Sequence, residues 1–231
     1  IIDLKIKCVI LCIKQMTSSC GVSKVIFDFD GVICKNKKLY QEVNRRSIDF
    51  VVKKTQFSFD EARHFNNNNY KEFGHTVNML KSYGIQTNLK EYNDYVFNDS
   101  MWNSVNKMLT DTDMINILCV KAFNTLVEDK SILFSNAPYN WCDNIVSMCG
   151  FTTSDLFEDV YTCDTHEEDL KPQTKLYDEI DSKYKDFDLY FLDDNKNNLE
   201  SAPSHWNTLQ VKEYDNLGEI LLCIASDINA K

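Results

Sequence analysis

Two aspartates stand within a strongly apolar segment, Lys24 to Ile33 (KVIFDFDGVI). The β-branched and aromatic residues around them are typical of a short buried strand that turns at a glycine. Buried carboxylates are costly unless a cation or another partner compensates for their charge. Asp28 and Asp30 are two positions apart, so in an extended strand their side chains project to one side. The pair therefore forms either a solvated strand end or a site for a hard divalent cation that does chemistry.

A second apolar strand has the same ending. In the segment FLDDNKNN, Phe191 and Leu192 are followed by Asp193 and Asp194. Taken alone, these two aspartates are equally explained as caps of the following helix. Two strands that both end in carboxylate pairs predict a metal site when the fold brings them together, and oxygen ligands favour Mg²⁺ over zinc.

Two further segments offer groups that bind phosphate. ILFSNAP ends a third strand with Ser135 and Asn136, and DLKPQTKLYDEI places Lys171 before Pro172 at a strand-to-helix junction. A hydroxyl, exposed backbone N–H groups and an ammonium can each hold a phosphoryl oxygen. Each segment also has an ordinary interpretation, as a turn with a capping serine and as a solvent-facing lysine before a helix-starting proline.

The overall composition limits the class of function. A chain of 231 residues with 43% hydrophobic residues can bury a full core, whereas a net charge of −10 without any basic run argues against nucleic-acid binding. The nine cysteines are scattered without zinc-site spacing, which indicates reduced thiols in a cytoplasmic protein. No apolar run is long enough to span a bilayer, so we expect neither a nucleic acid nor a membrane as partner.

The first fifteen residues precede Met16. Their apolar run, Cys8 to Ile13, is too short to cross a bilayer, and no small-residue cleavage site follows it. An extra strand, a weak targeting segment and sequence upstream of a start at Met16 stay open as interpretations, and we favour the last.

The order of the expected elements predicts the fold class. After the first strand the chain is helical in character up to residue 129, and from residue 131 strands and helices alternate regularly. This order predicts an α/β fold, a doubly wound parallel sheet with an inserted α-helical cap domain. Functional sites in such sheets lie at the carboxyl ends of the strands, where both aspartate pairs stand. The expected division is an N-terminal extension (1–23), a core domain (24–36 and 130–231) and a cap domain (37–129).

The four motifs occur in one order: D-x-D on the first strand, three apolar residues and serine on a later strand, K-P, and three apolar residues followed by D-D. This order resembles the haloacid dehalogenase (HAD) superfamily of phosphatases over nearly the whole chain from Lys24 onward, and the helical insertion resembles a type 1 cap. Within the cap, YKEFGHTVNMLKSYGI resembles the Y-x-x-Y-G segment of the pyrimidine 5'-nucleotidase branch, and FSNA resembles its F-T-N-A segment. The chain departs from that pattern at Ser135 (usually threonine), at Gly31 and Val32 (usually Asp-Thr) and at Trp141 (usually histidine), and the last departure leaves the substrate preference open.

The resemblance implies a role for each matched residue. Asp28 would attack phosphorus to give an aspartyl-phosphate, and Asp30 would protonate the leaving oxygen and later activate water. Ser135 and Lys171 would hold the phosphoryl oxygens, and Asn136 would contact the substrate or orient its loop.

The resemblance also implies the ligands of Mg²⁺. Asp28, Asp194 and the backbone carbonyl of Asp30 would bind the ion directly, and Asp193 would bind it directly or through water. Asn198 would hold the loop of the fourth motif together.

The expected function is therefore a magnesium-dependent phosphomonoesterase that hydrolyses a small-molecule phosphomonoester, a nucleoside 5'-monophosphate with a pyrimidine base favoured. A sugar-phosphate phosphatase or phosphomutase keeps every catalytic assignment and is the first alternative. A catalytically silent binding or regulatory protein of the same fold is the second, although no motif residue is missing. A dehalogenase is disfavoured, because that chemistry does not use the second aspartate.

The cap candidates for specificity are equally explained as core aromatics and loop polar residues: Tyr70, Phe73, His75, Asn78 and Tyr83.

Overall fold

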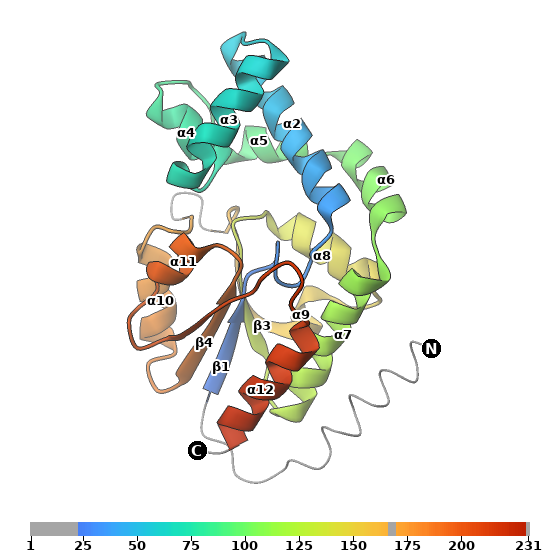
Figure 1. The fold of residues 1–231 in the computed structure, drawn as a ribbon, viewed down its shortest axis with the longest axis vertical. Coiled ribbons are helices and arrows are strands. Elements are labelled where there is room, and N and C mark those ends of the chain that lie inside the picture. The colour runs from blue at the N-terminus through green and yellow to red at the C-terminus, as the bar shows by residue number, and fades with distance from the viewer. Residues whose placement is uncertain (1–22, 166–169, 230–231) are drawn as a thin grey trace.

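The computed structural model describes residues 23–165 and 170–229 of the chain, so residues 1–22 of the predicted N-terminal extension (1–23) lie outside the described residues, and its last residue, Ser23, begins the first strand. These residues form one five-stranded sheet with helices around it (Figure 1). The strands are β1 (Ser23–Phe27), β2 (Ser131–Phe134), β3 (Phe157–Tyr161), β4 (Asp188–Asp193) and β5 (Asn207–Gln210). The helices are α2 (Lys37–Thr55), α3 (Phe59–Phe73), α4 (Thr76–Ser82), α5 (Leu89–Val96), α6 (Asp99–Met108), α7 (Asp111–Leu126), α8 (Tyr139–Met148), α9 (Thr153–Leu156), α10 (Lys175–Lys183), α11 (Lys196–Glu200) and α12 (Leu217–Asn229).

The sheet has the strand order β3-β2-β1-β4-β5, and every neighbouring pair is parallel. The chain moves outward from β1 through β2 to β3 and then returns to the other side of β1 with β4. Such a reversal opens a crevice at the carboxyl ends of the strands that flank it. The predicted α/β fold with a parallel sheet is confirmed, and β1, which carries the first aspartate pair at its end, lies at its centre.

The alternation of side chains along β1 explains why helices cover both faces of the sheet. Val25 and Phe27 point to one face and pack in the core cluster that also holds residues of α7, α8 and α12. Ile26 points to the other face and packs with residues of α10 and α11. Each of these side chains is at most 2% exposed, and burial of a residue of this size stabilises the fold by roughly 1.5–3 kcal/mol. The strand is therefore firmly held on both sides, and its end is a rigid place for a site.

Helices α2 to α6 lie over the carboxyl ends of the strands (Figure 1). Asn36 begins α2, and its side-chain oxygen accepts hydrogen bonds from the backbone N–H groups of Lys38 and Leu39. Its amide nitrogen donates to the carbonyl of Met108, at the end of α6, and to the carboxylate of Asp113, at the start of α7. One side chain thus ties together the two connections between the sheet and the helices above it.

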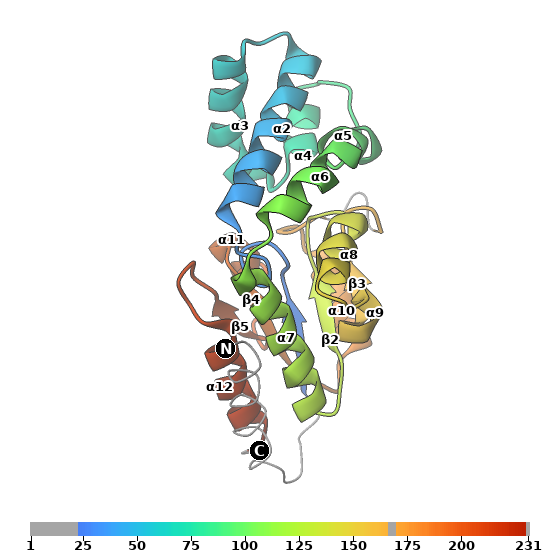
Figure 2. The same ribbon diagram turned by 90° about the vertical axis from the view of Figure 1, so that its right-hand side faces the viewer.

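Helix α7 falls inside the segment 37–129 that we expected to form the cap. It packs against α12 and α9, beside the sheet (Figure 2). Ile117, Val120 and Phe123 of this helix are buried in the same cluster as Val25 and Phe27. The helices over the strand ends are therefore α2 to α6, and the division of the chain into a core and a cap domain stays a prediction.

Over the described ranges, none of the helices combines the length and the apolar character needed to cross a membrane.

Candidate active site

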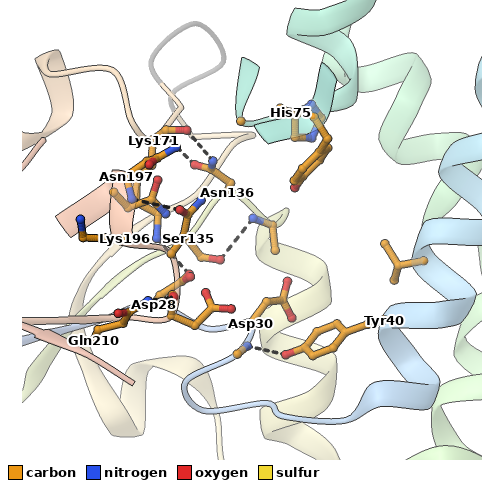
Figure 3. A pocket seen from close by; sticks show the side chains of 18 of the residues that line it. Asp28, Asp30, Tyr40, His75, Ser135, Asn136, Lys171, Lys196, Asn197 and Gln210 are labelled. Atoms are coloured by element: carbon orange, nitrogen blue, oxygen red, sulfur yellow. Dashed lines mark hydrogen bonds and ion pairs between the residues drawn. The ribbon is translucent and has the colours of Figure 1, made fainter. Parts of the chain in front are cut away.

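The carboxyl ends of β1, β2 and β4 bring the predicted residues to one place (Figure 3). The N–H of Asp28 donates to the carbonyl of Leu192 at 2.8 Å, so the β1–β4 pairing continues one residue past β1. This pairing sets Asp28 beside Asp193 and Asp194. In the same way, the N–H of Ser135 donates to the carbonyl of Tyr161 at 2.9 Å and continues the β2–β3 pairing. The site is thus positioned by extensions of the sheet.

Lys171 is the central cation of this cluster. Its Nζ lies 3.0 Å from Oδ1 of Asp28 and 2.6 Å from Oδ2 of Asp193, and the side chain is 1% exposed. Although burial lowers the pKa of Lys171, the Asp193 and Asp28 carboxylates raise it above its ordinary value. The ammonium therefore stays charged, and the interpretation of Lys171 as a solvent-facing lysine is wrong.

Asp193 and Asp194 have different surroundings although they are adjacent in sequence. Asp193 is 0% exposed, and besides Lys171 it accepts hydrogen bonds from the Asn198 amide at 3.0 Å and from the N–H of Asn195 at 2.8 Å. Asn198 is in turn held through its carbonyl by the hydroxyl of Tyr177 at 2.8 Å. Asp194 lines the cavity at the strand ends. Asp193 therefore positions Lys171, while Asp194 faces the space where a ligand can bind.

The carboxylates form a donor set that fits a hard divalent cation. One oxygen from each of Asp28, Asp193 and Asp194 lies within 4.8 Å of the others. Burial raises the pKa of Asp28 well above its ordinary value despite the nearby Lys171, and Asp193 and Asp194 raise it further. Burial also raises the pKa of Asp30 and of Asp194 to about 6 each. Asp28, Asp30, Asp193 and Asp194 gather around the ammonium of Lys171, and a bound Mg²⁺ would offset part of this negative charge.

Gly31 allows the loop after Asp30 to approach Asp194. Its φ is +83°, and a Cβ at this position would lie 2.4 Å from Cγ of Asp194. A residue with a side chain would be strained in that conformation and would also displace the carboxylate. The glycine that departs from the resembled pattern is therefore required by the geometry of this site.

Two aromatic residues that the sequence did not indicate as site residues hold Asp30 and the loop that follows it. Nε1 of Trp141 donates a hydrogen bond of 3.0 Å to Oδ1 of Asp30. The hydroxyl of Tyr40 accepts from the N–H of Gly31 and donates to the carbonyl of Cys34, so it closes the loop that follows Asp30. In the sequence, Trp141 stands out only as a departure at a histidine position, and no motif marks Tyr40.

Asn136 joins the loop after β2 to the loop that carries the lysine. Its amide nitrogen donates to the carbonyl of Lys171 at 2.8 Å, and its oxygen accepts from the N–H of Lys171 at the same distance. These two hydrogen bonds orient the loop, and Asn136 also lines the cavity, so contact with a substrate stays a prediction. Oγ of Ser135 accepts from the N–H of Ala137 at 3.2 Å, which leaves the hydroxyl proton available for a phosphoryl oxygen.

These residues open into a cavity of about 670 Å³ between the strand ends and the helices above. That volume suits a small organic ligand. The core side includes Asp28, Asp30, Ser135, Asn136, Lys171, Asp194, Asn197 and Gln210. The helical side includes Tyr40, Val43, Tyr70, Gly74, His75, Tyr92 and Phe97.

Only part of the predicted specificity set reaches this cavity. Tyr70 and His75 line it, whereas Phe73, Asn78 and Tyr83 are not among the lining residues. Tyr83 is exposed and its ring packs against Phe65 and Phe73 instead.

The sequence missed Tyr92 and Phe97, which line the cavity from α5 and its end. Tyr92 is spaced with Leu89 and Val96 along one buried face of α5, a pattern that does not say whether that face meets a core or a cavity, and Phe97 directly follows the helix.

His75 serves two purposes at once. Its Nδ1 accepts a hydrogen bond of 3.1 Å from the N–H of Val77 and caps α4, and its ring packs edge-on against Tyr92 with 4.8 Å between centroids. Burial lowers the pKa of His75 to about 4, so the ring is neutral at pH 7. With Nδ1 as acceptor, Nε2 carries the proton and His75 presents a neutral donor beside the cavity.

Comparisons with known proteins add little to this geometry. No protein-family model matches the sequence, and a search of curated proteins finds no significant match. Among solved structures, the chain is similar to the crystal structure of "putative beta-phosphoglucomutase from Thermotoga maritima", with 16% identity and a TM-score of 0.46 over 88% of this chain and 99% of that chain. A likeness at this level carries no argument about function, which therefore depends on the residues of this chain.

Proposed function

We propose that the protein is a magnesium-dependent phosphomonoesterase of the HAD type that works through an aspartyl-phosphate. The observation that carries this proposal is the position of Lys171, a buried ammonium held between Asp28 and Asp193 at the edge of a cavity. A nucleophilic carboxylate next to a fixed cation, with a second carboxyl group nearby for proton transfer, is what phosphoryl transfer through a covalent intermediate requires.

In the first step, a carboxylate oxygen of Asp28 attacks the phosphorus atom of the ester. The bond between phosphorus and the leaving oxygen breaks, and Asp30 donates its proton to that oxygen, so the alcohol departs neutral. With a pKa of about 6, Asp30 is protonated in roughly a tenth of the molecules at pH 7, which is enough for a general acid near neutrality. The Nζ of Lys171 and the hydroxyl of Ser135 offset the negative charge that builds up on the phosphoryl oxygens.

In the second step, water attacks the phosphorus atom of the aspartyl-phosphate. The carboxylate of Asp30, which lost its proton in the first step, takes one from the attacking water. The bond between phosphorus and the Asp28 oxygen breaks, inorganic phosphate leaves, and both carboxyl groups return to their starting states.

The carboxylates of Asp28 and Asp194 and the carbonyl of Asp30 would hold Mg²⁺, which supplies positive charge next to the transferred phosphoryl group when bound. Asp193 is already engaged by Lys171, Asn198 and the N–H of Asn195. Asp193 would therefore support the metal site indirectly, by fixing Lys171 and the end of β4.

The organic part of the substrate meets the helical side of the cavity. Tyr70, Tyr92 and Phe97 offer aromatic surface there, and His75 offers a neutral N–H donor. Aromatic surface with one directed donor supports a planar group that carries an acceptor, such as the base of a nucleoside 5'-monophosphate. The amides of Asn197 and Gln210 on the core side support a sugar phosphate as the second candidate, because they can pair with hydroxyl groups.

The test is phosphate release from a panel of nucleoside 5'-monophosphates and sugar phosphates, with Mg²⁺ or with chelator, alongside the Asp28→Asn variant. We expect release that depends on Mg²⁺ and is lost in Asp28→Asn. A preference for sugar phosphates would leave the catalytic assignment intact and replace the substrate class. Binding of phosphate esters without release from any of them would support a silent binding protein instead.

A further inference from the structure

We propose that Trp141 is a positioning residue for Asp30, a role that rests on the proposed function and goes beyond the matched motifs. Trp141 lies on α8 and is 1% exposed, and its Nε1 donates to Oδ1 of Asp30 at 3.0 Å. An indole N–H can donate but never accept. Oδ1 is therefore the oxygen that accepts from Trp141, which leaves Oδ2 for the proton transfer of the proposed reaction.

This assignment matters for a group that acts as acid and then as base. A carboxyl group that is free to rotate can turn either oxygen toward the leaving group. When a hydrogen bond fixes one of its oxygens, the other oxygen keeps a constant direction. Asp30 lies in the turn after β1, where its backbone forms an isolated bridge with Cys34. Among the described residues, the hydrogen bond from Trp141 holds its carboxyl group. The indole of Trp141 is thus what sets the direction of proton transfer.

The orientation of the indole is itself set by the helices above the sheet. Its ring lies 5.3 Å from the ring of Phe97 and 6.0 Å from the ring of Trp102, measured between centroids. Phe97 ends α5 and Trp102 belongs to α6, while Trp141 and Asp30 belong to the core side. The chain of contacts Phe97–Trp141–Asp30 therefore links the lining of the substrate cavity to the proton donor.

A kinetic experiment separates positioning from mere packing. Trp141→Phe keeps an aromatic ring and removes the N–H, and Trp141→His restores a donor, because imidazole Nε2 occupies the same place in its ring as indole Nε1. Each variant is assayed with an aryl phosphate, whose leaving group needs little protonation, and with an alkyl phosphate, whose leaving group needs a proton. The matched control is Trp206→Phe, which removes an indole–carboxylate hydrogen bond of 2.8 Å to Asp181 outside the cavity.

We expect Trp141→Phe to lower kcat for the alkyl phosphate about tenfold or more and kcat for the aryl phosphate less than about threefold, because general acid catalysis serves the poor leaving group. Trp141→His should recover much of the loss, and Trp206→Phe should leave the ratio of the two rates unchanged. Equal losses on both substrates, or a histidine variant no better than the phenylalanine variant, would overturn the positioning role.

A second readout is independent of turnover. The chain has three tryptophans, so the nitrogen–proton NMR spectrum should show three indole signals that Trp→Phe variants assign. Asp30→Ala should move the Trp141 signal and leave the Trp206 signal in place; an unmoved Trp141 signal would contradict the hydrogen bond. Wild-type protein that releases no phosphate overturns the proposed function and this role together, whereas active protein with equal losses on both substrates overturns this role alone.

Discussion

Two buried lysines form a matched pair for testing the electrostatic design of the site. Lys171 contacts Asp28 and Asp193, whose side chains are 9% and 0% exposed. Lys24 is also buried, at 4% exposed, but it contacts Asp129 and Glu158 at 2.6 Å each, and those side chains are 37% and 34% exposed. The two lysines thus differ mainly in whether the carboxylates they leave behind can be hydrated.

The substitutions are Lys171→Met and Lys24→Met. Removal of Lys171 leaves two carboxylates buried without a counter-ion, which costs about 3–5 kcal/mol of unfolding free energy. Removal of Lys24 leaves carboxylates that water can reach, so the expected cost is about 1–2 kcal/mol.

The assay is urea unfolding at pH 7.5 with chelator present, so that no divalent ion replaces the lost ammonium. The account predicts that Lys171→Met unfolds at clearly lower urea than Lys24→Met and has lost phosphate release, while Lys24→Met retains it. Equal costs for the two variants, or an active Lys171→Met protein, would refute the reasoning that Lys171 neutralises the site.

Three further predictions concern the helical side and the loop after Asp30. Gly74 has a φ of +66°, and a Cβ there would lie 2.6 Å from the carbonyl oxygen of Lys171. Gly74→Ala should therefore push the helices away from the site and lower kcat/KM at least about tenfold in steady-state assays. Unchanged kinetics would contradict that contact. His75 has an ordinary pKa of 6.5 that burial lowers to about 4, so at this residue the unfolded chain binds the extra proton, and the contribution of His75 to stability should fall by about 2 kcal/mol from pH 7.5 to pH 5. Asp30 and Asp194, whose pKa burial raises to about 6, act in the opposite direction over the same range. His75→Asn keeps a capping side chain and should remove that part of the pH dependence in urea titrations, and a slope equal to wild type would count against it. Tyr40→Phe loses the hydroxyl that joins Gly31 to Cys34, so it should lower the free energy of unfolding by about 1–2 kcal/mol and slow turnover. The control Tyr83→Phe, at an exposed tyrosine, should change neither.

The parts of the fold that sequence patterns predicted are those with local causes. The strand at Ser23–Phe27 follows from consecutive β-branched and aromatic residues, and its parallel neighbours follow from the regular alternation after residue 131. The positions of Asp28, Ser135 and Asp194 then follow from one rule, that a parallel sheet collects its strand ends at one edge. That rule needs no knowledge of side-chain packing.

The parts that sequence patterns missed depend on tertiary contacts. Trp141 and Asp30 are 111 positions apart, and nothing in the sequence near either residue indicates their hydrogen bond. Tyr92 lies on the buried face of α5 and Phe97 follows that helix, and only the placement of α5 over the sheet turns both residues toward a cavity. Helix α7 illustrates the same limit, because its apolar face would suit a helical domain or a sheet equally well, and it packs beside the sheet.

The central claim is that Asp28 carries a phosphoryl group during turnover. The most direct measurement is a rapid acid quench of the protein with its best substrate, followed by mass spectrometry of the peptide that contains Asp28. We expect a peptide heavier by one phosphoryl group that is absent in Asp28→Asn. With an aryl phosphate, whose leaving group needs little protonation, this peptide should accumulate in Asp30→Asn, because Asp30 activates the water of the second step. Phosphate release without any modified Asp28, or with the phosphoryl group on another residue, would contradict it.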